Sequence, residues 1–239
     1  MIRYDAILFD VGGTLLYGEP TDAALLARRF QAAGHHDAEA AINAAFHDAQ
    51  YKHLRSTART KDAAGNRESA RTYPDFLTIV AEEIRSLLHC ECSRTLIADT
   101  FETGKDDRRW KLLDPELPAL LSALRQKGYP VGIVSNWESG LQEVLEGAGI
   151  ARYFDEIVSS YDLGIEKPNP GIFLHACSQM QVASERTLYV GDMALDVVGA
   201  QSAGMEVALV GTTALATLAG LEIRPTFGLA KVSEVLGLL

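Results

Sequence analysis

From residue 110 onward, the chain alternates between short apolar segments and longer segments with helical periodicity. The apolar segments are residues 129–134, 154–159, 187–190 and 206–210, and the helical patterns between them cover residues 115–127, 140–146, 170–180 and 194–203. Parallel strands require crossover connections of this kind, and the helices cover both faces of the sheet, so its strands become uniformly apolar. This order predicts an α/β fold built on a parallel sheet.

One further apolar segment, residues 4–9, lies far from the others and ends at Gly12-Gly13. Between it and residue 110 we find only helical patterns, at residues 21–33, 38–54, 74–88 and 93–103. We therefore expect a Rossmann-like core domain formed by residues 1–15 and 110–239. An all-helical domain, residues 16–109, is expected as an insert within it.

Polar side chains follow the predicted strands or stand in the loops after them. In chain order they are Asp10, Ser135 with Asn136, Lys167, and Asp192 with Asp196. Ligands of open parallel sheets bind beyond the carboxyl ends of the strands. The sequence therefore predicts that carboxylates, a hydroxyl and an ammonium group converge at one edge of the sheet.

These segments resemble, in the same order, the four motifs of the haloacid dehalogenase superfamily. They are residues 9–15 (FDVGGTL), 135–136 (SN), 167–170 (KPNP) and 191–196 (GDMALD). The resemblance covers residues 4–15 and 110–211, and the insert lies where that family has its helical cap. It implies a hydrolase, and it implies that Asp10 is the attacking nucleophile.

The resemblance also implies roles for the second and third motifs. Ser135 and Lys167 would act in catalysis, and Ser135, Asn136 and Lys167 would bind the substrate. Elementary electrostatics supports these roles, because a carboxylate that attacks phosphorus approaches a group that is already negative. Hydrogen-bond donors and cations must cancel that repulsion. The implied reaction is hydrolysis of a small phosphorylated metabolite through an aspartyl-phosphate at Asp10.

A Mg²⁺ ion is the cofactor that the resemblance implies. Its ligands would be Asp10, Asp192 and the backbone carbonyl of Gly12, since hard cations prefer oxygen donors. Asp196 follows Asp192 by four residues, which places both on one face of an opening helix. We expect Asp196 to support the metal or its waters.

Gly12 departs from the phosphatases of this family, which carry a second Asp at that position. The second Asp protonates the leaving oxygen and then activates water. General acid–base help contributes roughly 10²–10⁴-fold to a rate. We therefore expect phosphatase activity that is weak, or restricted to good leaving groups, unless water or another side chain replaces the acid. Replacement of Gly12 by Asp should raise the phosphatase activity.

Two other readings remain open at this point. Dehalogenases and phosphonatases of the family also lack the second Asp, but dehalogenases use no Mg²⁺, and an acidic cluster without a cation is costly. A phosphonatase would need a cap lysine, for which Lys52 and Lys61 are the candidates. A family member that binds a ligand without catalysis is the other alternative. Trp137, beside the second motif, fits either packing or substrate contact.

Charge and composition limit the possible partners. The net charge of −10 disfavours nucleic acid and anionic membranes, which both need a basic surface. A basic stretch at residues 52–71 would attract an anionic substrate if it faced the site. No apolar run approaches the roughly 18 residues of a membrane span. With three cysteines, expected to be reduced thiols, and a charged N-terminal segment, we expect a cytoplasmic protein. Nothing in the sequence indicates an oligomeric state.

Overall fold

The computed structural model describes residues 3–57, 73–104, 109–137, 139–211 and 223–239. The chain divides into two compact units, one formed by residues 1–17 and 110–239 and the other by residues 18–109. Each unit has its own hydrophobic core. Among the described residues, no helix is both long and apolar enough to cross a membrane.

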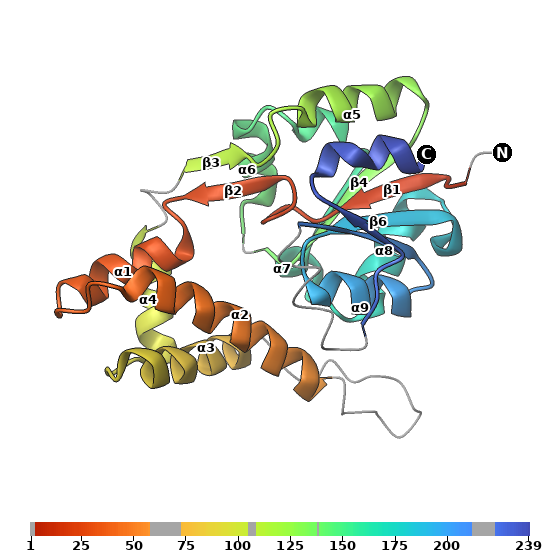
Figure 1. Cartoon of the computed structure of the whole chain (residues 1–239). Coiled ribbons are helices and arrows are strands. Elements are labelled where there is room, and N and C mark those ends of the chain that lie inside the picture. Colours follow the sequence, from red (N-terminus) through yellow and green to blue (C-terminus); the bar gives the residue numbers. More distant parts are fainter. Residues whose placement is uncertain (1–2, 58–72, 105–108, 138, 212–222) are drawn as a thin grey trace. The chain divides into compact units, whose positions relative to one another are not determined.

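A six-stranded parallel sheet, in the order β5-β4-β1-β6-β7-β8, forms the centre of the first unit (Figure 1). Its strands are β1 (Ala6–Phe9), β4 (Val131–Ser135), β5 (Glu156–Ser159), β6 (Thr187–Gly191), β7 (Glu206–Val210) and β8 (Phe227–Leu229). The segment nearest the N-terminus therefore lies between strands that come more than 100 residues later. The α/β fold predicted from the sequence is confirmed.

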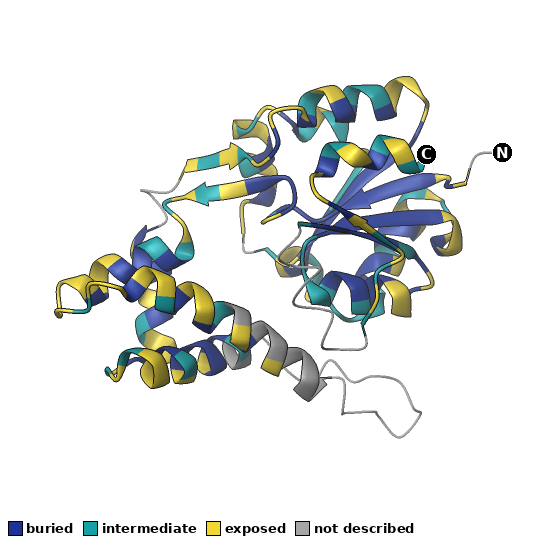
Figure 2. Cartoon of the chain, in the orientation of Figure 1, coloured by how far each residue is buried: buried dark blue, intermediate teal, exposed yellow. Residues whose placement is uncertain are grey.

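Helices cover both faces of this sheet (Figure 1). One face carries α5 (Leu117–Gln126), α6 (Leu141–Gly147) and the C-terminal 3-10 helix Val232–Leu238, and the other carries α8 (Pro170–Met180) and α9 (Ala194–Ser202). The sheet between them is buried, so its strands are apolar on both sides (Figure 2). The connections also contain α7 (Ser160–Leu163) and 3-10 turns at Ala151–Tyr153 and Ser184–Arg186.

Local signals explain where α8 begins and ends. Pro170 occupies the first turn, where its missing N–H has no intrahelical partner to lose. The Asn169 side chain accepts a hydrogen bond from the Gly171 amide at 2.8 Å and caps the helix. At the other end, Gln181 adopts a left-handed conformation with φ of 56°, which terminates the helix.

The second unit is helical within its described part. It contains α1 (Asp22–Gln31), α2 (Ala38–Thr57), α3 (Tyr73–Leu88) and α4 (Arg94–Gly104). Apolar side chains from all four helices meet in one core, among them Leu26, Ile42, Val80, Ile84 and Ile97, all fully buried. This regular packing follows the helical periodicity seen in the sequence.

Two short strands correct the prediction that residues 16–109 contain no strand. β2 (Leu16–Glu19) pairs with β3 (Arg109–Leu112) in a separate two-stranded sheet. Each strand has four residues and its partner lies about 90 residues away, so no local period or turn signal reveals the pairing. The three-residue strand β8 was missed for the same reason.

Close packing of α8 against α9 depends on Gly199. A Cβ atom at Gly199 would lie 2.5 Å from Phe173 Cε2 and 3.0 Å from Pro168 Cα. Both helices border the strand that leads to Asp192, so this contact also supports the edge of the sheet where the polar residues stand.

Gly199→Ala should lower the free energy of unfolding by about 1–3 kcal/mol, because the methyl group overpacks this contact. Tryptophan fluorescence during urea unfolding measures it, since both tryptophans belong to the α/β unit. Gly147→Ala in α6 is the matched control, because a Cβ atom there meets nothing within 4 Å. Equal stability of the two variants would contradict the packing argument.

Candidate active site

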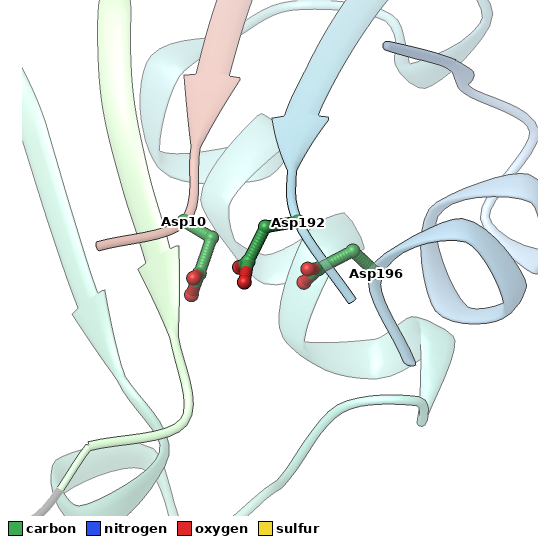
Figure 3. A group of neighbouring side chains, drawn as sticks. All are labelled: Asp10, Asp192 and Asp196. Carbon is green, nitrogen blue, oxygen red and sulfur yellow. The ribbon is translucent and has the colours of Figure 1, made fainter. Parts of the chain in front are cut away.

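Two aspartates leave the ends of neighbouring strands and carry their carboxylates side by side (Figure 3). Asp10 follows β1 and Asp192 follows β6, and Phe9 lies opposite Val190 in the sheet register. The Asp10 amide donates to the Val190 carbonyl at 2.8 Å, which extends the ladder by one residue. The parallel sheet therefore brings together two residues that are far apart in the sequence.

The Asp10 carboxylate accepts two hydrogen bonds on one oxygen. Ser135 Oγ donates to Asp10 Oδ1 at 2.8 Å, and Lys167 Nζ donates to the same atom at 2.6 Å. Lys167 Nζ also donates to Asp196 Oδ1 at 2.7 Å. All four side chains are buried. The structure thus brings one ammonium group, one hydroxyl and two carboxylates into direct contact.

Lys167 stays positively charged in this buried position. Burial lowers the pKa of the ammonium group, but Asp10 and Asp196 outweigh that effect and raise the pKa above its ordinary value. The ion pairs with Asp10 and Asp196 therefore stabilise the buried ammonium group of Lys167. Removing one partner of a buried ion pair typically costs about 3–5 kcal/mol, because the other charge is left uncompensated.

Asp10, Asp192 and Asp196 form a cluster in which one oxygen of each lies within 4.8 Å of the others. Burial, together with the nearby Asp10, raises the pKa of Asp192 well above its usual range, and burial also raises the pKa of Asp196. Three carboxylates share a single neighbouring ammonium group, so their negative charge is not fully balanced. Oxygen donors in this arrangement suit a hard divalent cation.

Two polar side chains of the site were missed in the sequence. Thr14 is fully buried, and its Oγ1 donates to Asp192 Oδ1 at 3.1 Å and lies 3.5 Å from Asp10 Oδ2. The Tyr189 hydroxyl accepts from Lys167 Nζ at 3.2 Å and lies 2.8 Å from the Val134 carbonyl oxygen. A threonine after a glycine turn is common and gives no indication of a functional role. The tyrosine was a partial clue, because a lone phenol within an apolar strand indicates a buried hydroxyl that needs a hydrogen-bond partner.

Tyr189 also touches the acidic cluster, with its hydroxyl 3.1 Å from Asp196 Oδ1. Burial, with the charge of Asp196 beside it, raises the pKa of the phenol. The hydroxyl therefore stays protonated and fixes the positions of Lys167 and Asp196 relative to the end of β4.

The glycines after Asp10 differ in what they tolerate. Gly13 has a φ of 79°, and a Cβ atom there would lie 2.3 Å from Asp192 Oδ2. Only glycine allows the turn to pass so close to the carboxylate. Gly12 has no positive φ, and a Cβ atom there would contact Trp137 Cζ3 at an ordinary 3.6 Å. A side chain at residue 12 is therefore sterically acceptable.

Asn136 holds the backbone of Lys167 in place. Its Nδ2 donates to the Lys167 carbonyl at 3.1 Å, and its Oδ1 accepts from the Lys167 amide at 2.7 Å. The side chain thus bridges the loop after β4 and the loop before α8. The expected contact of Asn136 with substrate stays a prediction.

Of the two candidate lysines in the insert, only Lys52 belongs to the described residues. Lys52 forms an ion pair with Glu83 of α3, inside the helical unit. Lys61 and most of the basic stretch 52–71 lie outside the described residues. The three cysteines are free thiols, of which Cys92 and Cys177 are buried.

Tyr189→Phe should lower the free energy of unfolding by about 1–3 kcal/mol, because the buried Lys167 and Asp196 lose a hydrogen-bond partner. Tyr129→Phe is the matched control, since its hydroxyl makes no hydrogen bond to the described residues. Urea unfolding of both variants checks this expectation. A Tyr189→Phe protein as stable as the control would show that the hydroxyl does not hold the charge network.

The chain is similar to known proteins over most of its length. A family model described as haloacid dehalogenase-like hydrolase matches residues 4–204. The magnesium-bound HAD-hydrolase YfnB of Bacillus subtilis has a TM-score of 0.71 at 23% identity, and the match covers 99% of each chain. The L-2-haloacid dehalogenase of Xanthobacter autotrophicus has a TM-score of 0.61 at 22% identity, covering 100% of this chain and 98% of that one.

A curated relative matches a shorter segment. The glyceraldehyde 3-phosphate phosphatase of Methanopyrus kandleri is 40% identical over 93 residues, which are 38% of this chain and 40% of that protein. The chain therefore matches less than half the length of this relative. The family match extends much further and includes both strand ends that carry the aspartates. The chain belongs to the haloacid dehalogenase-like hydrolase family.

Proposed function

We propose that this protein is a metal-dependent phosphatase that hydrolyses a small phosphorylated metabolite through an aspartyl-phosphate at Asp10. The observation that carries the proposal is the joint arrangement of Asp10 with Ser135, Lys167 and two further carboxylates at the end of the sheet. The glyceraldehyde 3-phosphate phosphatase named above supports it as a relative that acts on such a compound.

Lys167 and Ser135 are proposed to prepare the reaction. They donate to Asp10 Oδ1 and so fix the orientation of the carboxylate. The same donors would lower the repulsion between Asp10 and the phosphoryl oxygens, and donors fixed in advance need no reorganisation during the reaction. Asn136 and Tyr189 are positioning residues, because they act by holding Lys167.

Mg²⁺ is the metal that fits this donor set best. Three carboxylates within 4.8 Å of one another offer hard oxygen ligands, and one ammonium group leaves them short of positive charge. Asp10, Asp192 and the Gly12 carbonyl are the proposed ligands. Asp196 already binds Lys167 and accepts from the Met193 amide at 2.9 Å, which suits a supporting role. The ion would withdraw negative charge from the phosphoryl group.

The reaction has two steps. Asp10 forms a bond to phosphorus while the bond to the leaving oxygen breaks, and this gives an acyl phosphate on Asp10 and the free leaving group. Water then attacks phosphorus, and the bond between phosphorus and the Asp10 oxygen breaks. This step restores the Asp10 carboxylate and releases inorganic phosphate, which keeps the protons of the water. We propose that residues 18–109 act as the cap of this site. We also propose that the reaction takes place in the cytoplasm and that the protein binds neither nucleic acid nor a membrane.

Dehalogenation is the second candidate, and Gly12 is the observation that favours it. Halide leaves without a proton, so it needs no acid at residue 12. Against it stands the acidic cluster, because two buried carboxylates and a partly buried one without a metal cation are electrostatically costly. Metal-independent halide release from a 2-haloacid would support this candidate.

Asp10→Asn should lower the rate of phosphate release by at least about 10³-fold, because an amide cannot form the acyl phosphate. Release of phosphate from a panel of phosphomonoesters and acyl phosphates, with Mg²⁺ or with a chelator, measures it. Asp162→Asn, at an exposed position, is the control for loss of one negative charge. Activity that survives Asp10→Asn unchanged would overturn the proposed mechanism.

Mg²⁺ should stabilise the protein against unfolding, by about 2.7 kcal/mol at a concentration 100-fold above its Kd. Asp192→Asn should abolish this increase, while in metal-free protein it should not destabilise the fold, because it removes a repelled buried charge. Urea unfolding with Mg²⁺ and with a chelator gives both quantities, and Asp162→Asn should respond like the wild type. A full Mg²⁺ effect in Asp192→Asn would exclude the proposed ligand set.

A further inference from the structure

Trp137 covers the nucleophile loop beside Asp10. Its Cζ3 atom lies 3.6 Å from the place where a Cβ atom of Gly12 would be, so the indole is in van der Waals contact with that position. Gly12 itself stands two residues after Asp10 and has no side chain. An aromatic ring thus occupies the space next to Gly12, in the immediate neighbourhood of the nucleophile.

One contact to the ring and two to the backbone hold Trp137 in place. Trp110 of β3 packs against it, with ring centroids 4.6 Å apart and an angle of 49° between the planes. The Trp137 amide donates to Ser160 Oγ at 3.2 Å, and Ser160 Oγ lies 3.3 Å from the Trp137 carbonyl oxygen. Both rings pack against the core but are only partly buried. They therefore form a preorganised apolar surface that is still accessible.

The described side chains that hydrogen-bond to Asp10 are an ammonium group and two hydroxyls, and Gly12 brings no carboxylic acid to this position. Within the described part of the chain, the contacts of Asp10 come from Ser135, Lys167 and Thr14. Lys167 already donates to two carboxylates, Asp10 and Asp196, and Ser135 and Thr14 offer only hydroxyl groups. Efficient proton transfer needs a group that titrates near the working pH. Among the described residues, the hydrogen bonds of Asp10 thus offer a leaving oxygen no general acid, which favours leaving groups that are stable as anions.

We propose that Trp137, supported by Trp110, selects substrates whose leaving group is flat, conjugated and stable as an anion. Aryl and conjugated enol phosphates have this chemistry, whereas acetyl phosphate has a stable leaving anion but little planar surface for an aromatic contact. As the bond from phosphorus to the leaving oxygen breaks, that oxygen keeps the electron pair and its charge spreads over the conjugated system. The proton is taken up later from water. This inference rests on the proposed phosphatase function and names its substrate class.

The first test compares substrates that differ in the leaving group. We expect kcat/KM of the wild type with Mg²⁺ to fall steeply as the pKa of the leaving phenol rises across a series of substituted phenyl phosphates. Trp137→Leu should lower the ratio of kcat/KM for 4-nitrophenyl phosphate to that for acetyl phosphate by roughly two- to tenfold, the worth of an aromatic contact. Trp137→Phe should recover part of the ratio.

Gly12→Asp and Tyr161→Leu serve as matched variants. Gly12→Asp supplies the missing acid at a position that accepts a side chain, so it should raise the rate for poor leaving groups by about 10²-fold and flatten the dependence on leaving-group pKa. Tyr161, an aromatic residue with 66% of its surface exposed, contacts none of these groups, and Tyr161→Leu should leave the ratio unchanged. An unchanged ratio in Trp137→Leu would overturn the inference.

A binding measurement separates failure of the inference from failure of the proposed function. Calorimetry of the Asp10→Asn protein with Mg²⁺ should show phenylphosphonate binding roughly two- to tenfold more tightly than methylphosphonate, and Trp137→Leu in that background should remove the difference. Equal affinities would overturn the aromatic wall, even in an active phosphatase. Absence of metal-dependent turnover on every substrate would overturn the phosphatase proposal, and with it the proposed substrate class.

Discussion

The ammonium group of Lys167, placed between the carboxylates of Asp10 and Asp196, is the interaction on which the rest of the site depends. Without it, three acidic side chains would meet at the buried edge of a sheet. Two further residues hydrogen-bond to this lysine and fix its position. Asn136 binds its backbone, and Tyr189 binds its side chain. The geometry of the nucleophile is therefore set by residues from two loops, strand β6 and helix α9.

Much of the fold could be predicted because its elements carry local signals. The strands β1, β4, β5, β6 and β7 are apolar runs, and α8 is marked by proline and an asparagine cap. The elements that were missed carry none. β2, β3 and β8 have three or four residues each and gain their stability from a partner elsewhere in the chain. Their existence depends on tertiary pairing, which a local pattern does not contain.

The polar residues of the site divide in a similar way. Asp10 and Asp192 directly follow strands and Ser135 ends one, so the topology of a parallel sheet is sufficient to bring them together. Tyr189 and Thr14 could not be assigned, because their contribution is a hydrogen bond across the structure and not a position at a strand end. The substrate contact expected of Asn136 stays a prediction, and the structure adds that both polar atoms of its amide bind the Lys167 backbone.

The central place of β1 has a consequence for how the chain reaches this structure. Its neighbours β4 and β6 begin at Val131 and Thr187, so β1 has no sheet partner until the whole helical unit and the segment after it have been synthesised. The helical unit is contiguous and has its own core, and such local packing forms quickly. We infer that the inserted helices assemble while β1 is still an exposed apolar segment without its partner strands. The nucleophile is thus synthesised well before the strands that set its position.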